Sequence, residues 1–541
     1  MCVNFTQLSA ALPGENKFLR FPCKKMPMIV QLEQQTEIKA IPRNSAGMIC
    51  AQNEAVLPRG IRLSHPRPLP GGVFSDAPKS PEGAPGAMAE STGYAERGGL
   101  LFSNKSLRNL IIPLIVEQFL AVTIGIANTA MVSSCGEAAV SGVSLVDSLN
   151  VLLINLFSAV ATGGAVVAAQ YLGKGERLSA MQIANQLEYF SLAVALVISL
   201  VAIIFRDPAL RLIFNDIDLE VMQNARVYFL ISAISYPFLA VYNAGAALFR
   251  AMGNSRVSMM ISILMNIINV GVSAVGIFVL DLGVLGAAIA SLCARAVGGV
   301  LITILLTNPR HEIYLDQIWK IHIRFDLIKK IMQIGIPSGL ENSIFQLGKI
   351  LTMSIVSSFG TAAITANAVA GNLASIQVIP GNAIGMAMLT IVGQSVGAGD
   401  IKGAKAYTGK MMKLTYLSVW IITALLLLGR NVILSVYNLS AETSGILMQL
   451  FLLHAACCVV IWPLAFTLPN ALRAAGDAKF TMIISLVSMW TFRIGFSYVL
   501  ALTFHMGVMG IWIAMCVDWL FRAICFILRF KGDKWQRHRL V

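Results

Sequence analysis

The stretch Gln170-Tyr171-Leu172-Gly173-Lys174-Gly175-Glu176 has a second copy at Gln394-Ser395-Val396-Gly397-Ala398-Gly399-Asp400, 224 residues later in the chain. Three further matches have nearly the same offset: Pro113 with Pro337, residues 283–286 with 507–510, and residues 248–254 with 471–477. Chance produces one such match, but not four in register across a unit of this length. The chain therefore contains an internal duplication, and the sequence predicts two copies of one structural unit.

Apolar runs of membrane-spanning length recur throughout the duplicated region. Hydrophobic residues make up 56% of the 541 residues and charged residues only 13%, against roughly 25% charged in an ordinary soluble domain. A span needs about twenty residues and must be helical, because unpaired backbone groups are not tolerated in lipid. We expect twelve transmembrane helices, near residues 107–131, 138–168, 181–205, 223–249, 256–280, 284–307, 328–358, 363–393, 407–429, 443–471, 480–504 and 507–530.

Each copy holds six of these helices, and six is even, so both copies enter the membrane from the same side. The predicted fold class is an all-α membrane protein whose two six-helix bundles are related by a pseudo-two-fold axis along the membrane normal. Transporters built this way rock their two halves around a central site. The expected domains are an N-lobe at 105–307, a cytoplasmic linker at 308–327, a C-lobe at 328–530 and a basic cytoplasmic tail at 531–541.

Residues 1–104 differ in character from the rest of the chain. They are rich in proline and glycine, notably between Pro66 and Pro85, and contain no apolar core of a signal peptide. Such a segment buries too little apolar surface to offset its chain entropy. We expect it to be disordered or a non-native extension, and translation starting at Met88 is an alternative.

The basic residues indicate an orientation. Lys and Arg gather in alternate connections, which include Arg250 with Arg256 and Arg473 with Lys479, whereas the opposite connections hold Arg206, Arg211 and Arg430. Basic residues are enriched in cytoplasmic loops, so we expect a multi-pass protein of the cell membrane with both termini in the cytoplasm. Because the +14 formal charge lies in these short segments, no nucleic-acid partner is expected.

The sequence also resembles a known family. Residues 334–340 (Ile-Gly-Ile-Pro-Ser-Gly-Leu), 390–400 and 472–477 occur in the order and spacing of the multidrug and toxic compound extrusion (MATE) family, particularly its bacterial members. The resemblance covers about residues 105–530. It implies twelve helices in two bundles and antiport of diverse, often cationic, organic compounds in exchange for H⁺ or Na⁺. We expect no other cofactor, no enzymatic activity, small-molecule substrates and a monomer in the bilayer.

Two positions depart from the family pattern. Members commonly carry an aspartate fifteen residues after the first-helix proline, where this chain has Asn128. Some carry a glutamate eight residues after the seventh-helix proline, where this chain has Phe345. An amide cannot titrate, so Asn128 is not available for proton coupling. Both the coupling ion and its binding site therefore remain open at the level of sequence.

Glu117 and Glu341 are the most informative charges within the spans. Each lies four residues after its helix proline, Pro113 or Pro337, which is about one helical turn. A proline leaves a backbone carbonyl free and kinks the helix, and a carboxylate beside it is a candidate site for H⁺ or Na⁺. The alternative is a structural role, with each glutamate hydrogen-bonded to a neighbouring helix.

Other polar side chains within the spans are further candidates for ion or substrate binding. Asp147 and Asn150 lie within one turn of each other, and with Asn128 they are candidates to line a cavity in the N-lobe, where Asp147 is a second candidate site for Na⁺. Gln346 and Lys349 are the corresponding candidates in the seventh helix. All these residues also suit helix–helix hydrogen bonding.

A third group of charges has a spacing typical of structural ion pairs. Asp518 and Arg522 are four residues apart in the twelfth helix, and Arg493 lies in the eleventh. Arg295, in the sixth helix, has no partner that the sequence identifies. The main alternative function is a lipid-linked sugar or polysaccharide flippase of the same superfamily. We disfavour it because such proteins have a basic cavity, whereas the candidates here lean acidic and polar.

Overall fold

A computed structural model of the chain describes residues 101–213, 218–316, 322–437, 439–538 and 540–541. Within these ranges the chain is helical, with turns and no β-strand. The expectations for the N-terminal segment, including the start at Met88, fall almost entirely on residues 1–100, outside the described ranges.

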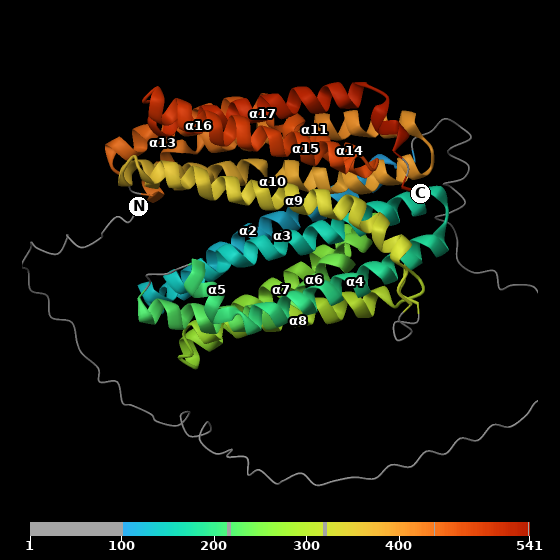
Figure 1. Ribbon diagram of the computed structural model, residues 1–541, viewed down its shortest axis with the longest axis horizontal. Coiled ribbons are helices and arrows are strands. Elements are labelled where there is room, and N and C mark those ends of the chain that lie inside the picture. The colour runs from blue at the N-terminus through green and yellow to red at the C-terminus, as the bar shows by residue number, and fades with distance from the viewer. Residues whose placement is uncertain (1–100, 214–217, 317–321, 438, 539) are drawn as a thin grey trace, which may run out of the picture. The chain divides into compact units, whose positions relative to one another are not determined.

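Two successive groups of helices correspond to the two sequence repeats (Figure 1). The first group comprises α2 (Asn104–Ser133), α3 (Glu137–Lys174), α4 (Arg177–Ile204), α6 (Leu219–Ala251), α7 (Ser255–Ala274) and α8 (Val284–Leu306). The second comprises α9 (Phe325–Ser357), α10 (Thr361–Gly397), α11 (Ile401–Leu428), α13 (Ala441–Val460), α14 (Leu468–Ala474), α15 (Ala478–Ser488), α16 (Phe496–Tyr498) and α17 (Gly507–Lys531). We call these groups the N-lobe and the C-lobe.

The predicted twelve-helix architecture is confirmed. Eleven stretches of the described chain are long and apolar enough to cross a membrane, and α9 is a twelfth helix of 33 residues. The apolar character of α9 is interrupted by charged residues, among them Glu341 and Lys349. π-Helical turns interrupt several spans, including Val275–Val279, which continues α7, Pro463–Thr467 between α13 and α14, and Met489–Gly495 and Val499–Thr503 on either side of α16.

The structure adds two short helices that the sequence analysis did not predict. These are α5 (Arg206–Ile213) and α12 (Arg430–Tyr437), and each follows the third long helix of its lobe at the 224-residue offset. The C-terminal tail also contains a 3₁₀ turn at Lys534–Arg537, where the Trp535 side chain is fully buried in the C-lobe core. The duplication therefore extends to the connections between spans.

Glycines in the duplicated stretch end the second helix of each lobe. Gly175 has φ +84° at the end of α3, and Gly399 has φ +75° just after α10. Residues other than glycine rarely adopt this left-handed backbone conformation, because their Cβ atom makes it costly. Asp400 then begins α11 by accepting a hydrogen bond of 2.7 Å from the Gly403 backbone N–H, as a helix N-cap does.

The two lobes contact each other through reciprocal interactions of this same stretch. Gln170 Nε2 in α3 donates a 2.7 Å hydrogen bond to the Ala474 carbonyl. Gln394 Nε2 in α10 donates an equivalent 2.7 Å bond to the Ala251 carbonyl. Paired contacts of this kind are what a two-fold axis between similar surfaces generates. The predicted pseudo-two-fold relationship between the lobes is therefore visible in individual bonds.

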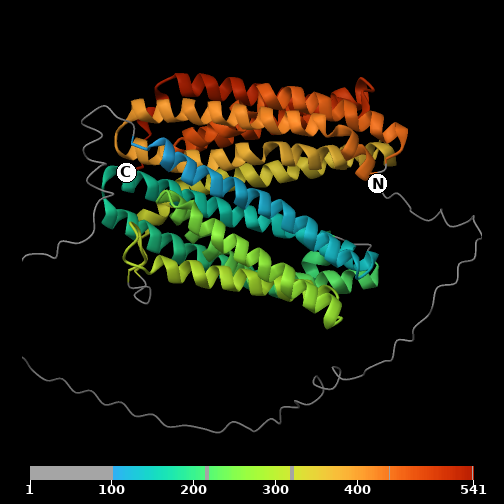
Figure 2. The same ribbon diagram turned by 180° about the vertical axis from the view of Figure 1, so that it is seen from behind.

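Helix α2 packs against both lobes. The side chains of Leu107, Leu110 and Leu114, in its first half, belong to a core cluster that consists mainly of C-lobe residues. Val132, near its end, packs in an N-lobe core instead. In the reverse view of the molecule, α2 (blue) accordingly runs from the C-lobe toward the N-lobe (Figure 2). The first helix thus links the two lobes beside the cavities described below.

Candidate transport cavities

The structure contains two adjoining cavities. One lies at the lobe interface, and the other lies within the C-lobe. The first, here called the central cavity, has a volume of about 410 Å³ and is lined by residues of both lobes. The second, here called the C-lobe cavity, has a volume of about 780 Å³ and is lined by C-lobe helices and α2. Phe345, Asn382 and Phe466 line both, so the two spaces adjoin.

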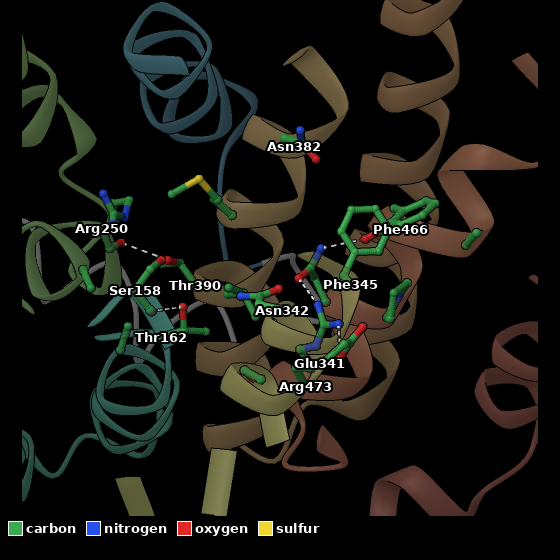
Figure 3. Close-up of a pocket in the computed structure, with 18 of the residues that line it drawn as sticks. Ser158, Thr162, Arg250, Glu341, Asn342, Phe345, Asn382, Thr390, Phe466 and Arg473 are labelled. Atoms are coloured by element: carbon green, nitrogen blue, oxygen red, sulfur yellow. Dashed lines mark hydrogen bonds and ion pairs between the residues drawn. The ribbon is translucent and has the colours of Figure 1, made fainter. Parts of the chain in front are cut away.

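Glu341 lies at the wall of the central cavity and is paired with an arginine. Its Oε2 atom is 2.7 Å from Arg473 Nη2, and its Oε1 atom accepts a 2.8 Å hydrogen bond from Ser485 Oγ. Arg473 also donates a 2.9 Å bond to Asn470 Oδ1. Figure 3 shows this ion pair on the C-lobe side of the cavity, with Arg250 and Thr390 across from it.

Glu117 has the equivalent environment in the N-lobe. Its Oε1 atom is 3.4 Å from Arg250 Nη1, and its Oε2 atom accepts a 2.9 Å hydrogen bond from Ser258 Oγ. Each glutamate thus has an arginine and a serine from the same two neighbouring spans of its lobe. These contacts favour the structural role over a free carboxylate for ion binding.

The placement of the two arginines corrects the sequence analysis. Arg250 and Arg473 were expected in cytoplasmic connections, but they lie in the last turns of α6 and α14. Their side chains turn inward to the glutamates, with only 15% and 16% of their surface exposed. Pairing explains why these charges are tolerated there, because an isolated charge in a span is costly.

Aromatic rings and positive charges dominate the C-lobe cavity. Its lining includes the rings of Trp462, Trp512 and Trp519, together with Lys349 and Arg493. The described residues that line it include no Asp or Glu. The cavities therefore lean basic, not acidic, which is a second correction, and the charge argument against the flippase alternative does not hold.

The Phe345 ring contacts both cations of this cavity. Its ring centroid is 5.1 Å from Lys349 Nζ and 5.4 Å from the Arg493 guanidinium carbon. At these distances the negative face of the ring attracts a cation. The aromatic side chain thus accounts for part of the stabilisation of both charges, and it does so without neutralising either one.

Arg493, Asp518 and Arg522 lie together beside the C-lobe cavity. Arg522 Nε is 2.8 Å from Asp518 Oδ1, and Arg493 Nη1 is 3.7 Å from Asp518 Oδ2. Ser488 also donates a hydrogen bond to Asp518 Oδ1. The fully buried Asp518 carboxylate is therefore the counter-ion of both arginines.

A small cavity in the N-lobe contains Asp147 and Asn128. It has a volume of about 80 Å³ and is also lined by Thr129, Tyr228 and Ser291. Asp147 is the only carboxylate among the described residues that line it, and Tyr228 donates a hydrogen bond to Asp147. The Asn128 side-chain oxygen is buried and has no hydrogen-bond partner among the described residues. The structure thus brings together two of the candidates from the sequence.

A hydrogen-bond network holds Asp147 in place. Asn150 Nδ2 donates to Asp147 Oδ1 at 3.1 Å, and Tyr236 donates from its hydroxyl to Asn150 Oδ1 at 2.8 Å. Arg295, for which the sequence analysis identifies no partner, donates a 2.7 Å hydrogen bond to Ser235 Oγ, and its positive charge attracts the Asp147 carboxylate. Asp147 is therefore near a cation but has no direct ion pair within the described part of the chain.

The remaining candidates have different positions. Pro113 and Pro337 are buried inside α2 and α9, whereas Gln346 lines none of these three cavities. Sequence reasoning missed the aromatic wall of the C-lobe cavity and the tyrosines around Asp147. Tryptophan and tyrosine inside apolar spans look like ordinary core residues, so no pattern separated them. Arg250 and Arg473 were detectable, because they occur at equivalent positions of the repeat.

Comparisons with known proteins agree with this architecture. The MatE family model matches residues 113–275 and 337–499, two segments offset by the same 224 residues. The chain is 27% identical to the uncharacterized transporter YisQ of Bacillus subtilis over 438 residues, covering 80% of this chain and 94% of YisQ. It is 26% identical over 454 residues to the probable multidrug resistance protein NorM of Thermotoga maritima, covering 81% and 94%.

Solved structures share the fold at low sequence identity. An outward-facing multidrug resistance MATE family transporter of the MOP superfamily matches with a TM-score of 0.74 at 18% identity, covering 79% of this chain and 95% of that one. A MOP superfamily transporter from Pyrococcus furiosus, whose binding pocket is described as having reversed polarity, matches with the same score, identity and coverage.

Proposed function

The chain belongs to the MatE family of membrane transporters, and we propose that it exports small organic compounds in exchange for H⁺ or Na⁺ by alternating access. Relatives named as probable multidrug resistance proteins span four-fifths of this chain, which supports drug export over a flippase activity. The observation that carries the proposal is a cavity at the junction of two repeat-related lobes, which adjoins a second cavity within the C-lobe.

The lobe contacts support alternating access. The reciprocal bonds of Gln170 and Gln394 join the lobes at the end where α3 and α10 finish. Both bonds end on backbone carbonyls close to the ends of α6 and α14, so a rocking motion can break them without disturbing either lobe core. Two-lobed transporters of this kind expose a midplane site to each side in turn.

Asp147 is the group we propose for ion coupling. Unlike Glu117 and Glu341, it has no arginine within ion-pair distance among the described residues. Asp147 and the unpartnered Asn128 oxygen both line the N-lobe cavity. Oxygen ligands of this kind suit a small hard cation, and a carboxylate also accepts a proton. The asparagine at position 128 then serves as a neutral ligand and leaves Asp147 as the only carboxylate among the described residues that line the cavity.

Transport by purified protein in proteoliposomes tests the proposal. Fluorescent organic probes should move against their gradient when a pH or a sodium gradient is imposed, and only the coupling ion should drive movement. The Asp147→Asn variant should retain probe binding and lose the response to the ion gradient. Unchanged gradient-driven transport in that variant would remove Asp147 from the mechanism, and absence of transport in the unmodified protein would refute the antiporter proposal.

The orientation belongs to the same proposal. We place the basic connections, such as the one at Lys174, and both chain ends in the cytoplasm, and we take the monomer as the functional unit. In that orientation the lobes of this structure are joined on the cytoplasmic side. Labelling of a cysteine introduced at Lys174 from each side of the membrane gives the orientation directly.

A further inference from the structure

The C-lobe cavity holds more positive than negative charge. Lys349 has no carboxylate within ion-pair distance among the described residues, and its ammonium group lies over the Phe345 ring. Arg493 and Arg522 share Asp518. Among the described residues, three cations are therefore matched by one carboxylate, and two positive charges remain without a counter-ion beside the cavity.

Arg493 also has unused hydrogen-bond donors. Its Nε and Nη1 groups are buried and find no hydrogen-bond acceptor within the described ranges, and its distance to Asp518 is a long 3.7 Å. The Arg493 side chain is 11% exposed and lines the C-lobe cavity. Buried donors without acceptors raise the free energy of a structure. An acceptor carrying negative charge would satisfy the donors and the charge together.

The walls of the cavity show what else a ligand must have. The rings of Trp462, Trp512 and Trp519 line it together with Phe466. Trp462 and Phe466 are stacked at 5.4 Å with an interplanar angle of 19°. Aromatic walls favour a flat ring, because ring pairs add to the energy of apolar burial. A volume of about 780 Å³ is in the range of pockets for drug-sized molecules.

From these observations we propose that the C-lobe cavity binds organic anions in which a carboxylate, sulfonate or phosphate is attached to an aromatic body. The anionic group lies between Lys349 and Arg493, and the aromatic body lies against the tryptophans. This inference rests on the proposed export function and narrows its substrate class. Cations are disfavoured here, because they would meet two uncompensated charges of the same sign.

Binding of two probes of equal size and opposite charge tests the inference. The probes are 1-naphthoate and 1-naphthylmethylammonium, and the signal is quenching of tryptophan fluorescence in the full-length protein. We expect naphthoate to bind about tenfold or more tightly than the ammonium compound, as a charge-assisted contact implies. Equal binding, or preference for the ammonium probe, would overturn the inference without any need for a variant.

Substitutions at Lys349 add a second, independent measurement. Lys349→Gln should weaken naphthoate binding about tenfold, and Lys349→Arg should restore it. The matched control is Lys413→Gln, which removes one exposed cation of α11 that lines neither cavity. Naphthoate binding that is insensitive to Lys349, in protein that elutes normally in size-exclusion chromatography, contradicts the inference.

Transport of the same probes in proteoliposomes separates this inference from the proposed function. If naphthoate binds as expected but neither probe moves under any ion gradient, the antiporter proposal fails and the binding site stands. If a gradient drives the ammonium probe and not naphthoate, the antiporter proposal stands and the anion assignment fails.

Discussion

Glu341 and Arg473 form a largely buried ion pair at 2.7 Å that lies in one wall of the central cavity. Its counterpart, Glu117 with Arg250 at 3.4 Å, lies at the equivalent place in the other lobe. Both pairs join the first span of a lobe to its fourth, and a serine of the fifth span completes each one. The cavity is thus framed by two neutralised pairs related by the repeat.

Removing one member of such a pair should destabilise the protein more than removing both. Glu341→Gln leaves Arg473 buried without its counter-charge, and we expect a loss of about 3 kcal/mol in the free energy of unfolding. The double variant Glu341→Gln with Arg473→Gln should recover part of that loss. Thermal unfolding in detergent measures both effects. Strictly additive losses would show that the two residues are not coupled.

Close contact of the lobes at Gly173 gives a second prediction. A Cβ atom there would overlap the Gln394 carbonyl of the other lobe, so Gly173→Ala should push the lobes apart at this end, at a cost of about 1–3 kcal/mol. Hydrogen exchange of the amides at 170–175 and 394–399 should accelerate. The control is Gly371→Ala in α10, where a Cβ meets nothing within 4 Å and alanine favours the helix.

Neutralising Asp518 should destabilise the protein far more than neutralising an exposed aspartate. Asp518→Asn leaves Arg493 and Arg522 without their shared counter-charge, and we expect a loss of about 3–5 kcal/mol in the free energy of unfolding. Asp533→Asn is the matched control, because Asp533 is 76% exposed and lies 3.9 Å from Lys405. A pair of that kind contributes at most about 1 kcal/mol. Similar unfolding temperatures for the two variants would contradict the assignment of Asp518 as a structural centre.

The linker between α8 and α9 should loosen as pH rises. Burial raises the pKa of the Glu312 carboxyl above its ordinary value, so the folded linker favours the protonated form. Its contribution to stability is present below the unfolded-state pKa and is lost as pH rises through the folded-state pKa. Hydrogen-exchange protection of residues 308–316, corrected for the intrinsic pH dependence of amide exchange, should therefore decrease from acidic to neutral pH. Glu312→Gln should remove that pH dependence, and a persistent response in this variant would exclude Glu312 as its cause.

The fold was predictable because its signals are long and repeated. Twelve apolar runs and a duplication in register determine the number of spans and the symmetry, and both were confirmed. The short helices α5 and α12 were not predicted, because eight residues give little periodicity. Their equivalent positions in the repeat carried a signal, since Arg206 and Arg430 begin them at the 224-residue offset.

The candidate site was only partly predictable, because contacts between spans depend on helix rotation. Sequence spacing predicted that Asp147 and Asn150 are neighbours, and it placed Asp518 one turn from Arg522. It could not show that Glu341 meets Arg473, which is 132 residues away. Nor could it show that the Phe345 ring contacts two cations, because one of them, Arg493, comes from a π-helical turn of another span.

The reciprocal bonds of Gln170 and Gln394 have a consequence for the origin of the chain. Each lobe contributes one glutamine donor and one free carbonyl to the junction, so a single lobe contains every group needed to pair with a copy of itself. An ancestor half as long could have assembled as a homodimer through these same two bonds before its gene was duplicated and fused. Separately expressed halves of the present chain should then still recognise each other.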